Sequence, residues 1–184
     1  MLPEEGVLEL DRVRLRALGE EHAAGLLVLY GDPEVTRYLA RPALREIDEA
    51  RAMVERAKAG FADGTSLQLA IERRKDGAFL GSCLLFHIHK ASARAELGYS
   101  LGREHWSHGY MAESLQGLVG HAFGPMALNR LEADIDPRNA ASARQLARLG
   151  FRREGLLRER WIVRGEASDS EMYGLLAREW RGSA

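Results

Sequence analysis

Residues 95–123 constrain the fold more than any other part of this chain, because the hydrophobic period changes within them. Leu97, Tyr99 and Leu101 alternate with polar residues or glycine, which is typical of a half-buried strand. From residue 112 onward, apolar residues recur at spacings of three and four and predict a helix packed against a sheet. Residues 107–109 form the predicted turn. Backbone N–H groups at a helix N-terminus suit a phosphate or pyrophosphate, although turn geometry alone also explains a glycine there.

Further strands and helices are predicted on both sides of this unit. Strand alternation covers residues 7–17, 66–72, 79–89, 95–101, 128–136, 151–161 and 171–176. Helical periodicity covers residues 20–29, 47–59, 112–123 and 140–149. Asp76-Gly77 predicts a tight hairpin turn. The order of these elements predicts an α/β (α+β) fold in a single domain, residues 1–184, with a mixed, mostly antiparallel seven-stranded sheet flanked by about four helices.

The composition narrows the class of protein. A formal net charge of −1 gives no argument for nucleic acid as a partner. No apolar run is long enough to span a membrane and no signal segment is visible, so no membrane partner and a cytoplasmic location are expected. Cys83 is the only cysteine, which excludes an intramolecular disulfide, and its apolar neighbours predict a buried thiol. The histidines lack a third ligand at a suitable spacing, so no metal is expected.

Two motifs resemble those of the GCN5-related N-acetyltransferase (GNAT) superfamily, and within it the RimJ/RimL-type ribosomal-protein N-acetyltransferases. The first joins Ala-Glu-Leu-Gly-Tyr at residues 95–99 to Trp-Ser-His-Gly-Tyr-Met-Ala-Glu at residues 106–113. The second comprises Asn-Ala-Ala-Ser at residues 139–142 and Leu-Gly-Phe at residues 149–151. Ser107 stands where that branch usually has a glycine, so a residue with a Cβ must be accommodated there. The resemblance implies the GNAT fold and the use of acetyl-CoA or another acyl-CoA as cosubstrate.

The resemblance also implies which residues bind the acyl-CoA. They lie on the strand, in the turn, at the start of the following helix and on the Asn-x-x-Ser helix: Tyr99, Ser100, Leu101, Trp106, Ser107, His108, Gly109, Tyr110, Met111, Ala112, Asn139, Ser142 and Arg144. Arg103 and Arg148 are further candidates for the CoA phosphates, or simply surface arginines. Independently of the family, Asn139 is predicted to cap a helix by accepting from the backbone N–H of Ser142, which leaves the Ser142 hydroxyl free.

Transfer of an acyl group to an amine benefits from a base for the amine and a proton donor for the departing thiolate. Glu96 matches the family's usual base; the alternative is a solvated carboxylate paired with Arg94 or Lys90. The resemblance makes Ser142 the first candidate for the proton donor. Tyr173 is the second, with a core strand tyrosine as the alternative.

In the resembling family, the helical pair between the first two strands forms one wall of the acceptor groove. This implies acceptor contacts from Tyr30, Thr36, Tyr38, Leu39 and Phe61, unless these are packing residues. Independently of the family, His87 and His89 share a strand face, and either of them is a candidate to reach the groove. We expect acetyl transfer to a primary amine, either a protein N-terminal α-amino group or a small amine, by direct attack in a ternary complex. The alternatives are a catalytically silent CoA-binding sensor or scaffold, an N-succinyltransferase using succinyl-CoA, and a nucleotide-binding protein. The family makes a homodimer possible.

Overall fold

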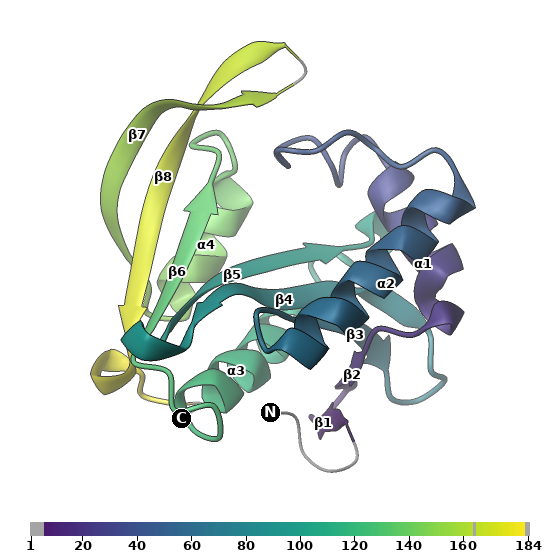
Figure 1. Cartoon of the computed structure of the whole chain (residues 1–184), viewed down its shortest axis with the longest axis horizontal. Coiled ribbons are helices and arrows are strands. Elements are labelled where there is room, and N and C mark those ends of the chain that lie inside the picture. Colours follow the sequence, from purple (N-terminus) through teal and green to yellow (C-terminus); the bar gives the residue numbers. More distant parts are fainter. Residues whose placement is uncertain (1–5, 164, 183–184) are drawn as a thin grey trace.

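The computed structural model describes residues 6–163 and 165–182 and contains one continuous eight-stranded sheet (Figure 1). Its strands lie in the order β1-β2-β3-β4-β5-β6-β8-β7. Their bounds are β1 (Val7–Glu9), β2 (Val13–Ala17), β3 (Leu67–Arg73), β4 (Phe79–His89), β5 (Arg94–Leu101), β6 (Arg130–Ile135), β7 (Arg152–Val163) and β8 (Glu166–Leu176). Only β5 and β6 pair in parallel; the other neighbours are antiparallel. The predicted mixed, mostly antiparallel sheet is confirmed.

The count of eight strands rather than seven arises in residues 7–17. This segment was expected to be one edge strand, but it folds back on itself as the hairpin β1–β2, in which Leu8 lies opposite Leu15. The backbone N–H of Leu10 donates to Val13 O at 3.0 Å and closes the turn. A two-residue turn between alternating segments leaves the period of two nearly undisturbed, so the sequence pattern did not reveal it.

Helices cover both faces of the sheet (Figure 1). A 3₁₀ turn (Glu20–His22) leads into α1 (Ala23–Gly31), which with α2 (Ile47–Asp63) buries one apolar cluster on the first face. On the opposite face, α3 (Tyr110–Phe123) and α4 (Ala140–Arg148) enclose the larger core, to which β2 to β6 and β8 contribute. No helix in the described ranges is both long and apolar enough to cross a membrane.

The pairing of β5 with β6 is short. It covers only Arg94, Ala95 and Glu96 of β5, opposite Arg130, Leu131 and Glu132, and the two strands then diverge (Figure 1). On its other side, β5 remains paired with β4 as far as Leu101. Beyond Glu96, therefore, the backbone N–H and C=O groups of β5 that point away from β4 have no neighbouring strand. The divergence opens the centre of the sheet between its two helical layers.

Candidate active site

The turn before α3 presents the start of that helix without a side-chain cap. Gly109 is the N-cap residue with φ of +81°, and no side chain accepts a hydrogen bond from the first turn. A Cβ at position 109 would lie 3.2 Å from Nη2 of Arg12, whose Nη1 donates to His108 O at 2.9 Å. The Nε of Arg12 also forms an ion pair with Glu113 Oε2 of α3 at 2.7 Å. The unpartnered N–H groups at the start of α3 fit an anion such as a pyrophosphate.

A cavity of about 300 Å³ lies between this turn and α4. Its walls include six of the predicted acyl-CoA residues, namely Leu101, Ser107, Gly109, Met111, Ala112 and Arg144, together with Arg148. They also include His105, Ala141 and Gln145, which the sequence analysis missed. Ala141 and Gln145 share a face of α4 with Arg144 and Arg148, so helical spacing from Arg144 could have identified them.

Other predicted acyl-CoA residues shape the turn without lining this cavity. The Trp106 indole N–H donates to Leu101 O at 2.8 Å, and the rings of His108 and Tyr110 stack at 5.9 Å. Arg103 lies elsewhere, with its Nε 3.5 Å from Asp32 Oδ2. These contacts hold the backbone that leads into α3.

Ser107 adopts the left-handed conformation, with φ of +64°. A side chain with a Cβ is strained there, and glycine is not. Ser107→Gly should therefore raise the free energy of unfolding by about 1 kcal/mol, because relief of the strain exceeds the added freedom of the unfolded chain. Urea unfolding measures this. Ser92→Gly, at a residue outside the left-handed region, is the control and should be destabilising; equal effects of the two substitutions would contradict the explanation.

Asn139 and Ser142 connect α4 to β5. Asn139 Oδ1 accepts from the backbone N–H of Ser142 at 3.1 Å, which confirms the predicted helix cap. The Ser142 hydroxyl is not free as expected, because its Oγ lies 2.6 Å from the Tyr99 hydroxyl. Burial raises the pKa of Tyr99 to about 12, although the hydrogen bond with Ser142 acts in the opposite direction. The Tyr99 phenol is therefore protonated at neutral pH and can donate.

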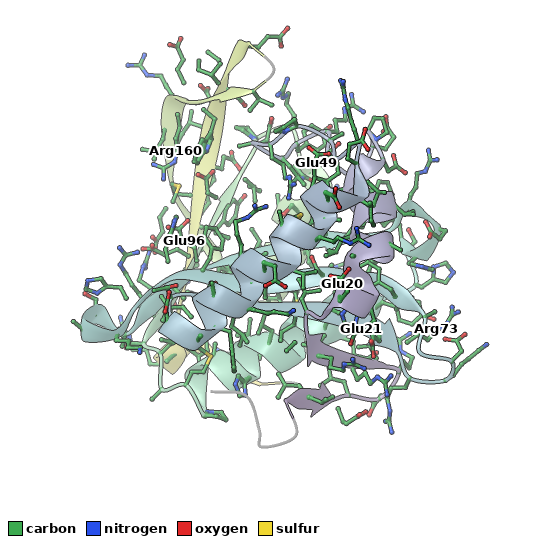
Figure 2. The ribbon with its side chains drawn as sticks, turned by 45° about the vertical axis from the view of Figure 1, so that its right-hand side comes forward. Glu20, Glu21, Glu49, Arg73, Glu96 and Arg160 are labelled. Carbon is green, nitrogen blue, oxygen red and sulfur yellow. The ribbon has the colours of Figure 1, made fainter. Side chains whose placement is uncertain are left out.

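Glu96 is the last β5 residue paired with β6, and Figure 2 shows it on the sheet. Its side chain is 18% exposed, and Oε1 lies 2.9 Å from Nδ1 of His87. The alternative pairing with Arg94 is wrong, since Arg94 donates to Glu132 at 3.0 Å. His87 has φ of +48° at an irregularity in the β4–β5 register, so a β-bulge places its ring beside Glu96.

Tyr173 belongs to the larger core cluster. Its hydroxyl donates to Glu171 Oε2 at 3.0 Å. Burial and this hydrogen bond both raise the pKa of Tyr173 above its usual value. Because its proton is directed to Glu171, Tyr173 is less suitably arranged than Tyr99 to serve a thiolate.

A second cavity, of about 500 Å³, lies on the α1–α2 side of the sheet. It reaches Gly98, Tyr99 and Ser100 of β5, and its walls include the predicted acceptor residues Tyr30 and Leu39. The remaining wall residues, which were not predicted from the sequence, are Ala40, Arg41, Met53, Arg56, Ala57, Ser66, Gln68, Leu84 and Phe86. Met53, Arg56 and Ala57 follow helical spacing on α2 and could have been found; Arg41 lies in an irregular loop that carries no such signal.

Four other predicted acceptor residues do not line this cavity. Thr36 is fully buried and donates through Oγ1 to Asp32 O at 3.0 Å. The guanidinium of Arg37 lies over the ring of Tyr38. His87 contacts Glu96, and Phe61 lines a separate cavity beside Leu128.

Two further observations concern the possible metal ligands and the thiol of Cys83. Within residues 6–163 and 165–182, no group of three or more His, Cys, Asp or Glu side chains is placed to hold a metal ion. Cys83 is completely buried, as predicted, and burial raises the pKa of its thiol far above the usual range.

Known proteins resemble this chain over most of its length. The family model of the acetyltransferase (GNAT) domain matches residues 12–152. The uncharacterized N-acetyltransferase p20 of Bacillus licheniformis is 34% identical over 175 residues, which are 95% of this chain and 98% of that protein. Mycobacterium smegmatis RimJ, solved in complex with CoA-disulfide, superposes with a TM-score of 0.88 at 25% identity, covering 100% of this chain and 93% of RimJ. RimL, the ribosomal L7/L12 α-N-protein acetyltransferase solved with coenzyme A, has a TM-score of 0.86 at 24% identity, over 92% of this chain and 97% of its own. The predicted family is thereby confirmed: this chain is a member of the GNAT family of N-acetyltransferases.

Proposed function

We propose that this enzyme transfers an acetyl group from acetyl-CoA to a primary amine by direct attack in a ternary complex. The observation that carries the proposal is the position of β5 between two cavities. Leu101 lines the cavity at the α3 turn, whereas Gly98 and Ser100 line the cavity beside α1 and α2. The open edge of β5 thus offers a path from an anion-binding turn to an acceptor site. The CoA complexes of RimJ and RimL support the same cosubstrate.

Acetyl-CoA supplies the acetyl group as a thioester when bound. Glu96 removes a proton from the acceptor ammonium, directly or through a water molecule, so that the nitrogen lone pair can form the new N–C bond as the C–S bond breaks. Backbone N–H groups near Tyr99 or Ser100 donate to the carbonyl oxygen as its negative charge develops. The Tyr99–Ser142 pair donates a proton to the departing sulfur and is reprotonated by the second proton that the nitrogen loses as the amide forms, so that the products are the amide, the free thiol and protonated Glu96.

The acceptor is either a protein N-terminus or a small amine. RimL is named for α-N-acetylation of a ribosomal protein, and the uS5-alanine N-acetyltransferase of Escherichia coli is 31% identical over 84 residues, 46% of this chain and 43% of that protein. An α-amino group has a reference pKa of about 7.7–8.0, far below the 10.4 of a lysine side chain. It therefore needs less assistance from a base such as Glu96 at neutral pH.

Thermal unfolding with acetyl-CoA, succinyl-CoA, free CoA or ATP tests the cosubstrate. A ligand that binds only the native state adds about 2.7 kcal/mol at a hundredfold excess over its Kd, which corresponds to about 5–10 °C in Tm for a chain of this size. We expect this rise with acetyl-CoA, followed by transfer to an amine in a thiol-release assay. A rise without transfer to any amine would identify a silent CoA-binding protein, and a rise with ATP alone a nucleotide-binding protein. A larger rise in Tm and faster transfer with succinyl-CoA than with acetyl-CoA would identify an N-succinyltransferase.

A further inference from the structure

The acceptor-side cavity combines apolar walls with two arginines. Leu39, Met53, Leu84 and Phe86 provide apolar surface, while Arg41 and Arg56 provide the charge. Among the described residues that line it, none is acidic. A site for polycationic amines would need carboxylates in these walls, because like charges brought together in a cavity repel.

Neither arginine forms an ion pair with a carboxylate of the described residues, although the charge of Arg41 contributes to lowering the pKa of Glu49. Arg41 directs Nη1 to the sulfur of Met53 at 3.2 Å, and its guanidinium lies 4.7 Å from the centre of the Tyr30 ring. Its Nε is buried and has no hydrogen-bond partner. Glu49 is a neighbouring carboxylate, but it accepts hydrogen bonds from the backbone N–H groups of Arg45 and Glu46. A partly buried cation with an unused donor fits an anionic ligand.

The proposed base lies beside this cavity, on the sheet, whereas the two arginines line its opposite wall. Glu96 projects from the same face of β5 as Gly98 and Ser100, which line the cavity. Arg56 belongs to α2, and Arg41 to the loop that precedes it. An acceptor could therefore place its amine at the sheet and its anion toward α2.

We propose that the acceptor carries a carboxylate or phosphate as well as its amine, and that Arg41 and Arg56 bind this anion. The apolar walls fit an aliphatic or aromatic body between the two groups. This inference rests on the proposed acetyl transfer and names the class of its acceptor: an amino acid or other anionic amine, and not a polyamine or an aminoglycoside.

Acetylation kinetics with matched acceptors test the inference. Leucine and phenylalanine are each compared with the corresponding amide. A peptide with aspartate at its third position is compared with the same peptide carrying asparagine there. Spermidine serves as the polycationic acceptor. We expect kcat/KM to be at least about tenfold higher for the anionic member of a pair. Preference for the free amino acids assigns the anion to an α-carboxylate, and preference confined to the acidic peptide assigns it to a peptide side chain. Faster transfer to the amides or to spermidine would overturn the inference.

Variants separate anion binding from a general loss of structure. We expect Arg41→Gln to raise KM for the anionic acceptors about tenfold and to leave KM for the amides unchanged. The same result is expected for Arg56→Gln, which changes an exposed residue of α2. Arg51→Gln, on the same helix but paired with Glu20 and Asp48, is the matched control and should change neither. If the arginine variants raised KM equally for the anionic acceptors and for the amides, the inference about the anion would be wrong, but the proposed acetyl transfer would stand. Absence of transfer to every amine would overturn the proposed function, and this inference with it.

Discussion

Replacing Glu96 by glutamine should lower kcat/KM for acetyl transfer by about a hundredfold or more, without changing the Kd of acetyl-CoA. Glutamine keeps the size of the side chain but cannot accept the ammonium proton, and a positioned general base contributes about 10²–10⁴ in rate. Steady-state kinetics with varied amine at saturating acetyl-CoA, together with calorimetric titration of acetyl-CoA, measure the two quantities. His87→Asn should have a smaller effect, because His87 only holds the carboxylate through its 2.9 Å contact.

Glu132→Gln provides a matched control for Glu96→Gln. Glu132 lies opposite Glu96 in the β5–β6 register and is similarly exposed, 21% against 18%. It differs in being held by Arg94 and Arg130, so it is not available as a base. We expect its loss to leave kcat nearly unchanged. If both substitutions lowered kcat equally, Glu96 would be a structural carboxylate and the base would lie elsewhere.

Local patterns predicted most of the fold because each depends on residues close in sequence. The cap of Asn139 on Ser142 spans three residues and was predicted correctly. The helices and the central strand–turn–helix unit follow from periodicity alone. The hairpin in residues 7–17 was not predicted, because its turn hardly disturbs the alternation of apolar and polar residues.

The contacts that assemble the site span much longer separations in sequence. Tyr99 reaches Ser142 across 43 residues, at a position where β5 is no longer paired with β6. His87 reaches Glu96 because of a bulge that no local pattern indicated. Arg41 enters the acceptor cavity from an irregular loop, whose course depends on the packing of α1 and α2. Sequence motifs could thus nominate residues, whereas their partners depend on the tertiary arrangement.

Glu72 is a buried carboxylate on β3 that is held by His22 and Arg14. Its side chain is only 6% exposed on β3; Oε1 lies 2.8 Å from Nε2 of the buried His22, and Oε2 accepts from Arg14 Nε at 2.5 Å. His22 immediately precedes α1, which carries Tyr30 into the cavity. Burial acts to raise the pKa of Glu72, but the hydrogen bonds from His22 and Arg14 outweigh it, so the pKa lies below its usual value. The folded state therefore favours the carboxylate and uses it to attach the start of α1 to the sheet.

Glu72→Ala should lower the free energy of unfolding by about 3 kcal/mol at pH 7. This value is at the lower end of the range for breaking a buried ion pair, because the Arg14 side chain that loses its partner is 34% exposed and can be hydrated. Since the folded pKa is depressed, this stabilisation is present above the unfolded pKa of about 4.3 and is lost as the pH falls through the folded value. Urea unfolding from pH 7 to pH 3 should show the wild-type advantage shrinking in acid. Glu20→Ala, which removes an exposed partner of Arg51 (Figure 2), should leave the midpoint unchanged. A wild-type advantage that stayed constant with pH would mean that packing of the side chain, and not its charge, attaches α1 to the sheet.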